Sequence, residues 1–480
     1  MQREHLGSRL GFLLLSAGCA IGIGNVWKFP WMTGQYGGGA FVLIYLLFLL
    51  ILGVPVLTME FAMGRAAQKS PLKMYGQLKP GTKWGWHGYV CLLGNVVLMM
   101  FYTTVSGWML QYFVNTAAGA FAGLDTAGIE AKFGEMLASP GKMALYMGIV
   151  VVIGFSVISL GVQKGLERVT KWMMMSLILL MWVLAFHSMT LPGSSTGLTF
   201  YLIPDFQRMS GIGVGNVIVG AMNQAFFTLS LGIGAMAIFG SYIGKDHALM
   251  GEAVRVSLLD TMVALCSGLI IFPACFAYGV DVNSGPALIF MTLPKVFVNM
   301  AGGRLWGALF FLFMTFASFS TVIAVFENLL SSCIDNFGWS RKKAVLLNAA
   351  FILIASLPCV LGYNLWSGFH PFLGKDVLDS EDFIVSNLLL PIGSLVYLLF
   401  CVTKWGWGFD KFLAEANTGS GLKLPESGVL KTLFHIYFAV VLPILILVIL
   451  VQGLPSRGWQ IGVCAVTLAF LALMARRKKA

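Results

Sequence analysis

The chain has 480 residues, of which 58% are hydrophobic and only 11% are charged, so it holds more apolar side chains than a soluble core can bury. The formal net charge of +11 comes from basic residues scattered over loops, without a basic surface interleaved with stacking aromatic residues, which argues against nucleic-acid binding. The composition excludes an ordinary soluble domain and predicts a protein whose solvent is partly the lipid bilayer.

Apolar stretches long enough to cross a bilayer recur along the whole chain and are nearly free of charge. Lipid offers no hydrogen-bond partner to the backbone, so each stretch is predicted to be a helix. We therefore expect an all-α integral membrane protein with about twelve spans. The spans are expected to begin near Arg9, Gly39, Gly88, Gly141, Glu167, Ile212, Gly251, Gly303, Lys343, Asp382, Leu430 and Gly458.

The basic residues predict the orientation of these spans. With the N-terminus inside the cell, most of the 31 Lys and Arg fall in cytoplasmic segments, as the positive-inside rule requires. An even number of spans returns the C-terminus to the same side, where Arg476, Arg477, Lys478 and Lys479 form a strong positive anchor. We expect a multi-pass protein of the cell (inner) membrane with both termini cytoplasmic. The sequence leaves the oligomeric state open.

The sequence contains no cluster of residues that is typical of an enzyme active site. Most of the eight cysteines fall inside apolar spans without paired spacing, and the six histidines are dispersed near span ends and loops. No nucleotide-binding loop or nucleophile triad is recognisable. We therefore expect no enzyme activity, no disulfide framework and no zinc site.

Two spans carry the same glycine-rich interruption, Ile-Gly-Ile-Gly at 21–24 and Leu-Gly-Ile-Gly at 231–234. Each glycine costs about 1 kcal/mol of helix stability relative to alanine, so such clusters indicate unwinding. The alternative is close helix packing through small residues. Position favours unwinding, because the first and sixth spans open two consecutive five-helix halves, as an inverted repeat requires.

We accordingly expect a ten-helix transport core at 1–403, built as a 5+5 inverted repeat with halves at about 1–190 and 210–403 and with helices 1 and 6 broken. The remaining residues, 404–480, are expected to form a cytoplasmic loop and two accessory helices, 11 and 12. Unwound segments at mid-membrane offer carbonyl groups to a cation and helix N-termini to a carboxylate.

Longer motifs follow these spans in order, and together they are highly specific. They resemble the neurotransmitter:sodium symporter family, in particular a bacterial amino-acid transporter, over spans one to ten. The matching blocks are Arg3–His5, Ser8–Gly11, Gly22–Pro30, Gly37–Phe41, Glu60–Arg65, Lys164–Arg168, Gln224–Gly232 and Thr292–Pro294.

The resemblance implies two Na+ sites made of hard oxygen ligands. The first would use the Ala20 carbonyl with Asn25, Thr228 and Asp260. Asn25 as a cap of the helix break and Thr228 bonded to its own helix are alternative readings. The second would use the carbonyls of Gly18, Ile21 and Ala317 with the hydroxyls of Ser320 and Thr321.

Asp260 departs from the commonest family pattern, which has asparagine at that position. It occupies either the ligand position itself or the neighbouring place where relatives hold chloride. Either reading implies a fixed negative charge, so that no chloride is required, even though Tyr45 and Gln224 of the anion site are retained.

For the substrate, the resemblance implies a carboxylate held by the amides of Ile23 and Gly24 and by the Tyr102 hydroxyl. Gly22 stands where amine-carrying relatives have aspartate, which favours an amino acid. No charged side chain faces the predicted pocket, so a neutral, apolar or aromatic substrate fits best. The full set is Ala20, Gly22, Ile23, Gly24, Leu98, Tyr102, Phe227, Thr228, Ser230, Ile233, Thr321 and Val325.

The resemblance also implies two gates. Lys28 would face Asp382 through water on the outer side, with a looser contact than the usual arginine provides. Arg3 and Asp335 would form the inner pair.

These features predict a sodium-coupled secondary symporter that imports a neutral, apolar or aromatic L-amino acid by alternating access. The expected partners are the small-molecule substrate and the lipid bilayer. The alternative is a non-transporting amino-acid sensor or a channel on the same fold. The preferred amino acid, the sodium stoichiometry and proton counter-transport stay open.

Overall fold

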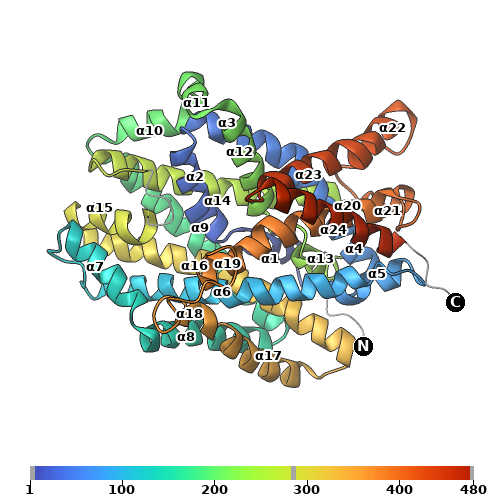
Figure 1. Ribbon diagram of the computed structural model, residues 1–480, viewed down its shortest axis with the longest axis horizontal. Coiled ribbons are helices and arrows are strands. Elements are labelled where there is room, and N and C mark those ends of the chain that lie inside the picture. Colours follow the sequence, from blue (N-terminus) through green and yellow to red (C-terminus); the bar gives the residue numbers. More distant parts are fainter. Residues whose placement is uncertain (1–5, 283–287, 476–480) are drawn as a thin grey trace.

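The computed structural model describes residues 6–282 and 288–475, and within these the secondary structure is helical apart from two isolated β-bridges (Figure 1). The all-α prediction is confirmed. Two features of the sequence, the proposed gate residue Arg3 and the basic cluster at 476–479, lie outside the described residues.

Ten helices in the described part of the chain are long and apolar enough to cross a membrane. Six of them are the predicted spans 2, 3, 4, 5, 7 and 8, and four are spans 9 to 12. Their bounds are Gly39–Ala67 (α3 and α4), Trp86–Ala117 (α6), Pro140–Ser159 (α8), Val162–Met189 (ending in α9), Leu249–Ala277 (α14), Gly303–Phe337 (α16), Arg341–Leu361 (α17 and α18), Val377–Val402 (α19 and α20), Gly428–Gln452 (α22 and α23) and Arg457–Met474 (α24).

The two remaining predicted spans, the first and the sixth, are both broken. Helix α1 (Arg9–Ala20) is followed after three residues by Gly24–Gln35, which contains α2 (Phe29–Gln35), and the two axes differ by 56°. Helix α12 (Val214–Thr228) is separated from the short α13 (Ala235–Gly240) by six non-helical residues. The breaks lie where the glycine pattern predicted them.

Proline explains why four spans contain a widened, π-helical turn. Such turns at Gly24–Lys28, Leu49–Gly53, Ile384–Leu389 and Tyr437–Val441 are each followed two residues later by a proline. Proline has no N–H group, and its ring clashes with the carbonyl one turn earlier, so the preceding turn widens. The helix then continues in the same span as α2, α4 (Val54–Ala67), α20 (Leu390–Val402) or α23 (Leu442–Gln452).

Short helices lie in the connections between spans. They are α5 (Pro71–Leu78), α7 (Thr126–Leu137), α10 (Ser194–Leu202), α11 (Phe206–Ile212), α15 (Leu293–Asn299) and α21 (Phe409–Ala416).

The centre of the molecule is built on the long helices α6 and α16, which pack against each other more extensively than any other pair of elements (Figure 1). Helix α1 packs against both α16 and α14, so the broken first span is enclosed by long helices. In an apolar stretch of 18 residues, 78% of the residues are buried in α16 but only 17% in α24. The last span therefore lies at the periphery of the bundle.

Candidate functional site

The break in the first span exposes backbone carbonyl groups toward α16. The Thr321 hydroxyl lies 3.4 Å from the Gly18 carbonyl oxygen and 3.2 Å from those of Cys19 and Ile21. The Ser320 hydroxyl lies 3.2 Å from the Ile21 carbonyl oxygen and 2.9 Å from that of Ala317. All five residues predicted for the second sodium site, Gly18, Ile21, Ala317, Ser320 and Thr321, thus come together at one buried place.

A second group of oxygen atoms surrounds Asp260 of α14. The Asn25 side-chain amide donates to Asp260 Oδ1 at 2.8 Å and to the Asp260 carbonyl at 3.1 Å, and the Thr228 hydroxyl donates to Oδ2 at 3.0 Å. All three side chains are buried, and they come from the first, sixth and seventh spans. In the described part of the chain no Lys or Arg forms an ion pair with Asp260. A carboxylate buried in this way lacks a compensating positive charge, which fits a bound cation.

The residues next to this cluster are also tied to the broken first span. The Gln224 side-chain amide donates to the Gly24 carbonyl at 2.9 Å, and Ser267 donates to the Asn25 carbonyl at 2.8 Å. Tyr45 is buried and packs its ring 4.9 Å from that of Phe29. Ala20, whose carbonyl is predicted to complete the first sodium site, lines the adjoining cavity together with Thr228.

That cavity lies between the two broken spans and α6. The Tyr102 hydroxyl accepts a hydrogen bond from the Ile23 amide at 2.9 Å. A Cβ at Gly22 would lie 2.1 Å from the Tyr102 hydroxyl and 2.6 Å from that of Thr321, so only glycine fits. The lining residues are Ala20, Gly22, Gly24, Leu98, Tyr102, Phe227, Thr228, Ser230, Ile233, Thr321, Val385 and Leu390, none of which is charged.

Ten of the twelve predicted substrate-binding residues line this cavity. The other two lie close by: Ile23 presents its amide to Tyr102, and Val325 is buried on α16 one turn beyond Thr321. Sequence reasoning missed Val385 and Leu390 of the tenth span. The sequence feature that pointed to Val385 is its spacing from Asp382, because a residue three positions further along a helix lies on the same face.

The cavity has a volume of about 30 Å³, enough for roughly two water molecules. This volume is smaller than a free amino acid. Phe227 is a half-buried residue of the cavity wall. The Lys28 ammonium makes a cation–π contact with its ring, 3.7 Å from the ring centroid.

Of the four predicted gate residues, Lys28, Asp335 and Asp382 belong to the part of the chain that the structure describes. Lys28 and Asp382 form no direct ion pair within the described residues; the Asp382 carboxylate instead accepts from the Ser386 hydroxyl at 2.7 Å. A water-bridged contact between them stays a prediction. Asp335 accepts from the Ser70 amide at 2.7 Å, and its proposed partner Arg3 lies outside the described residues.

The unwound part of the sixth span, Leu229 to Gly234, is held by buried polar groups. The backbone is left-handed at Ser230 (φ 51°), Gly232 (φ 102°) and Gly234 (φ 75°), a conformation that is costly for serine. Glu60 of α4 accepts from the Gly232 amide at 2.6 Å. The sequence identified Glu60 only as part of a motif. Its hydrogen bond with Gly232 was not predicted, because the two residues are 172 positions apart in the chain.

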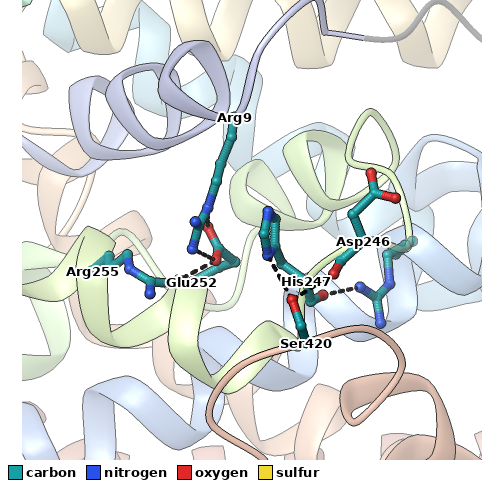
Figure 2. A network of polar contacts seen from close by, with 7 residues as sticks. Arg9, Asp246, His247, Glu252, Arg255 and Ser420 are labelled. Atoms are coloured by element: carbon teal, nitrogen blue, oxygen red, sulfur yellow. Dashed lines mark hydrogen bonds and ion pairs between the residues drawn. The ribbon is translucent and has the colours of Figure 1, made fainter.

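At the end of the bundle that holds the N-terminal end of α1, charged side chains meet at the first turn of α14. Figure 2 shows Arg9 and Arg255 converging on Glu252, with N···O distances of 2.6 Å and 2.7 Å. Beside them, Ser420 binds the strand-like segment at Asp246 and His247, with its amide 2.9 Å from the Asp246 carbonyl (Figure 2). This network joins the first and seventh spans and the loop that follows α21.

The sequence matches a known protein family and two related transporters. Residues 3–123 and 129–456 match the sequence profile of the Sodium:neurotransmitter symporter family. The chain is 36% identical over 413 residues to the uncharacterized sodium-dependent transporter YhdH of Bacillus subtilis, covering 86% of this chain and 90% of that one. It is 32% identical over 444 residues to an uncharacterized sodium-dependent transporter of Methanocaldococcus jannaschii, covering 88% and 86%.

A solved structure is also similar. The crystal structure of MhsT in complex with L-phenylalanine superimposes with a TM-score of 0.83 at 34% sequence identity, covering 94% of this chain and 100% of that chain. The relatives are transporters, which are not enzymes.

Proposed function

Because the chain belongs to the sodium:neurotransmitter symporter family, we propose that it carries a neutral, apolar or aromatic L-amino acid into the cell together with Na+. The observation that supports this most is the uncharged cavity bounded by Gly22, Tyr102 and the Asp260 cluster. It pairs a place for a carboxylate with a buried negative group that needs a cation. A relative of this chain, MhsT, has been solved with L-phenylalanine.

The substrate carboxylate would bind the Tyr102 hydroxyl and the amides of Ile23 and Gly24, at the N-terminal end of the second half of the broken first span. Its side chain would extend among Leu98, Phe227 and Ile233. Since no charged side chain lines the cavity, a charged substrate side chain would be desolvated without compensation.

Two Na+ ions would bind beside the substrate, the first at Ala20, Asn25, Thr228 and Asp260 and the second at Gly18, Ile21, Ala317, Ser320 and Thr321. Carboxylate, carbonyl and hydroxyl oxygens are ligands that suit a hard cation. Asp260 would also supply the negative charge that relatives obtain from chloride, so transport would be chloride-independent.

Alternating access would use the two broken spans as its moving parts, with Lys28 and Asp382 closing the outer side and Asp335 with Arg3 closing the inner side. The protein would lie in the cell (inner) membrane with both termini in the cytoplasm. A sensor that binds but does not transport, or a channel that conducts without coupling, is the competing function on this fold.

Equilibrium binding of radiolabelled L-phenylalanine and L-leucine to the purified protein tests the substrate and the coupling ion together. We expect saturable binding in Na+ and little binding when K+ replaces it. Equal binding in the two salts would reject sodium coupling. If only amines or charged amino acids compete for the label, the assigned substrate class is wrong.

A further inference from the structure

Ile233 forms one wall of the cavity and belongs to the unwound segment of the sixth span. Its side chain is only 1% exposed. Its backbone carbonyl accepts a hydrogen bond at 2.8 Å from the side-chain amide of Asn95, a buried residue of α6. The same amide group donates to the Cys91 carbonyl at 2.7 Å, so Asn95 is itself anchored to its own helix. Asn95 thus fixes the position of the Ile233 backbone without lining the cavity.

Gly94, the residue before Asn95, has no side chain and so leaves room for the Ile233 side chain. A Cβ at Gly94 would lie 2.9 Å from Ile233 Cγ2, which is closer than carbon atoms pack, and it would touch Leu389 Cδ1 at 3.4 Å. The Cγ2 methyl is attached directly to Cβ, and a β-branched side chain has restricted χ1 rotation. Since Asn95 holds the carbonyl, Ile233 cannot turn away easily. A larger residue at 94 would therefore displace the Ile233 side chain toward the cavity.

Retreat of the whole segment is blocked on another side. A Cβ at the neighbouring Gly232 would lie 2.1 Å from the Leu390 carbonyl oxygen, which shows how closely this segment already packs on the tenth span. The Gly232 amide is in turn held by Glu60. The unwound segment is therefore confined between α4, α6 and α20.

We propose that Gly94 and Asn95 are specificity-determining residues that set the depth of the substrate side-chain pocket by seating Ile233 against α6. Gly94 provides the space for the Ile233 methyl group, and Asn95 fixes the backbone that carries it. This inference rests on the proposed function, because it concerns how large a substrate side chain the same cavity accepts.

The test measures sodium-dependent binding of L-phenylalanine and L-valine to the full-length protein and its variants. Gly94→Ala should lower the ratio of L-phenylalanine to L-valine affinity by at least about tenfold, the discrimination that one methyl group can produce in an apolar pocket. Asn95→Ala should also reduce this ratio while leaving the Na+ dependence of L-valine binding unchanged. Gly148→Ala and Asn348→Ala are the matched controls. A Cβ at Gly148 meets only Leu353 Cδ2 at 3.8 Å, and Asn348 makes a similar bond to its own helix.

A double variant shows whether the effect passes through Ile233. Truncation in Ile233→Ala removes the methyl group, so adding Gly94→Ala to that variant should leave the ratio unchanged. This comparison also applies if Gly94→Ala alone fails to fold. An unchanged ratio in folded Gly94→Ala, or an equal shift in the Ile233→Ala background, would overturn the inference while the proposed function stands. If the wild-type protein binds no amino acid with sodium, the proposed function and this inference both fall.

Discussion

Gly22 occupies a position where the chain has no room for a side chain, since a Cβ there would lie 2.1 Å from the Tyr102 hydroxyl. The motifs that resemble the symporter family predicted substrate contacts for Gly22 and Tyr102 and a sodium contact for Asp260, and these roles stay predictions. What the sequence could not provide was the set of contacts among residues far apart in the chain. The bond between Asn25 and Asp260 crosses 235 residues, and the bond between Glu60 and Gly232 crosses 172. Helical periodicity describes which residues share a face but not which face meets another helix.

Removing the Tyr102 hydroxyl tests how the substrate carboxylate is held. We expect Tyr102→Phe to weaken amino-acid binding by about 1.5–3 kcal/mol, because a hydrogen bond to a charged group is lost and the Ile23 amide loses its partner. Isothermal or radioligand titration in Na+ measures the change. Tyr89→Phe on the exposed face of the same helix is the control and should bind normally. Unchanged affinity in a folded Tyr102→Phe protein would place the carboxylate elsewhere.

Asp260 is the residue on which the proposed chloride independence depends. Asp260→Asn should lower Na+ affinity, because the neutral amide no longer balances the charge of the ion in a buried site. In the wild-type protein, Na+ affinity should fall as pH falls and the carboxylate takes up a proton, since only the ionised form supplies the negative charge. Sodium titrations of binding across a pH series measure both effects.

The exposed Asp410, which pairs with Lys431, serves as a control for the loss of one carboxylate. Asp410→Asn should leave the sodium titration unchanged. If a cavity for an anion persists near Tyr45 and Gln224, added chloride should partly restore Na+ affinity in Asp260→Asn. A sodium titration of Asp260→Asn that matches the wild type would remove Asp260 from the proposed ion site.

At the scale of whole elements, the glycine patterns at 21–24 and 231–234 predicted both broken helices, because the cost of glycine in a helix is local and readable. The widened turns before prolines in four of the spans were not predicted. Proline marks a disturbed turn, but whether the helix kinks, ends or widens depends on the neighbouring helices. One widened turn contains Val385, which lines the cavity, so an unpredicted backbone feature contributes directly to the site.

Substitution of Gly232 tests whether the unwound backbone of the sixth span is required for substrate binding. Gly232→Ala should abolish or strongly reduce substrate binding, since the residue has φ 102° and a Cβ would lie 2.1 Å from the Leu390 carbonyl oxygen. Gly215→Ala is the matched control in α12, because a Cβ there meets no atom within 4 Å. Binding assays on both proteins, after size-exclusion chromatography confirms folding, give the comparison. Normal binding by Gly232→Ala would show that this backbone conformation is not needed.

At the scale of the whole molecule, hydropathy predicted the order of the spans, but it did not predict the contacts of the segment after the tenth span. Helix α21 carries Glu415, which accepts a hydrogen bond from Arg65 Nε at 2.6 Å although the two residues are 350 positions apart. Arg65 is fully buried and also donates to the His247 carbonyl at 2.7 Å. The predicted boundary between a core at 1–403 and accessory residues at 404–480 is therefore crossed by a buried ion pair.

Breaking this pair should destabilise the protein. Arg65→Met should cost about 3–5 kcal/mol, because it leaves the Glu415 carboxylate without its buried partner. The double variant Arg65→Met/Glu415→Leu should recover much of the loss. Lys431→Met, which removes the exposed pair with Asp410, should cost no more than about 1 kcal/mol. Thermal unfolding in detergent ranks the three proteins, and equal midpoints for Arg65→Met and Lys431→Met would show that the buried pair adds nothing.

Uptake of labelled L-phenylalanine into sealed proteoliposomes with Na+ outside and K+ inside tests sodium-coupled transport most directly. Sodium-coupled symport predicts accumulation above the external concentration and its collapse when Na+ is equal on both sides, and chloride independence predicts no change when gluconate replaces chloride. Uptake that only equilibrates the amino acid, whatever the Na+ gradient, would identify a channel or uncoupled carrier. Binding without uptake would identify a sensor, and either result would contradict sodium-coupled symport.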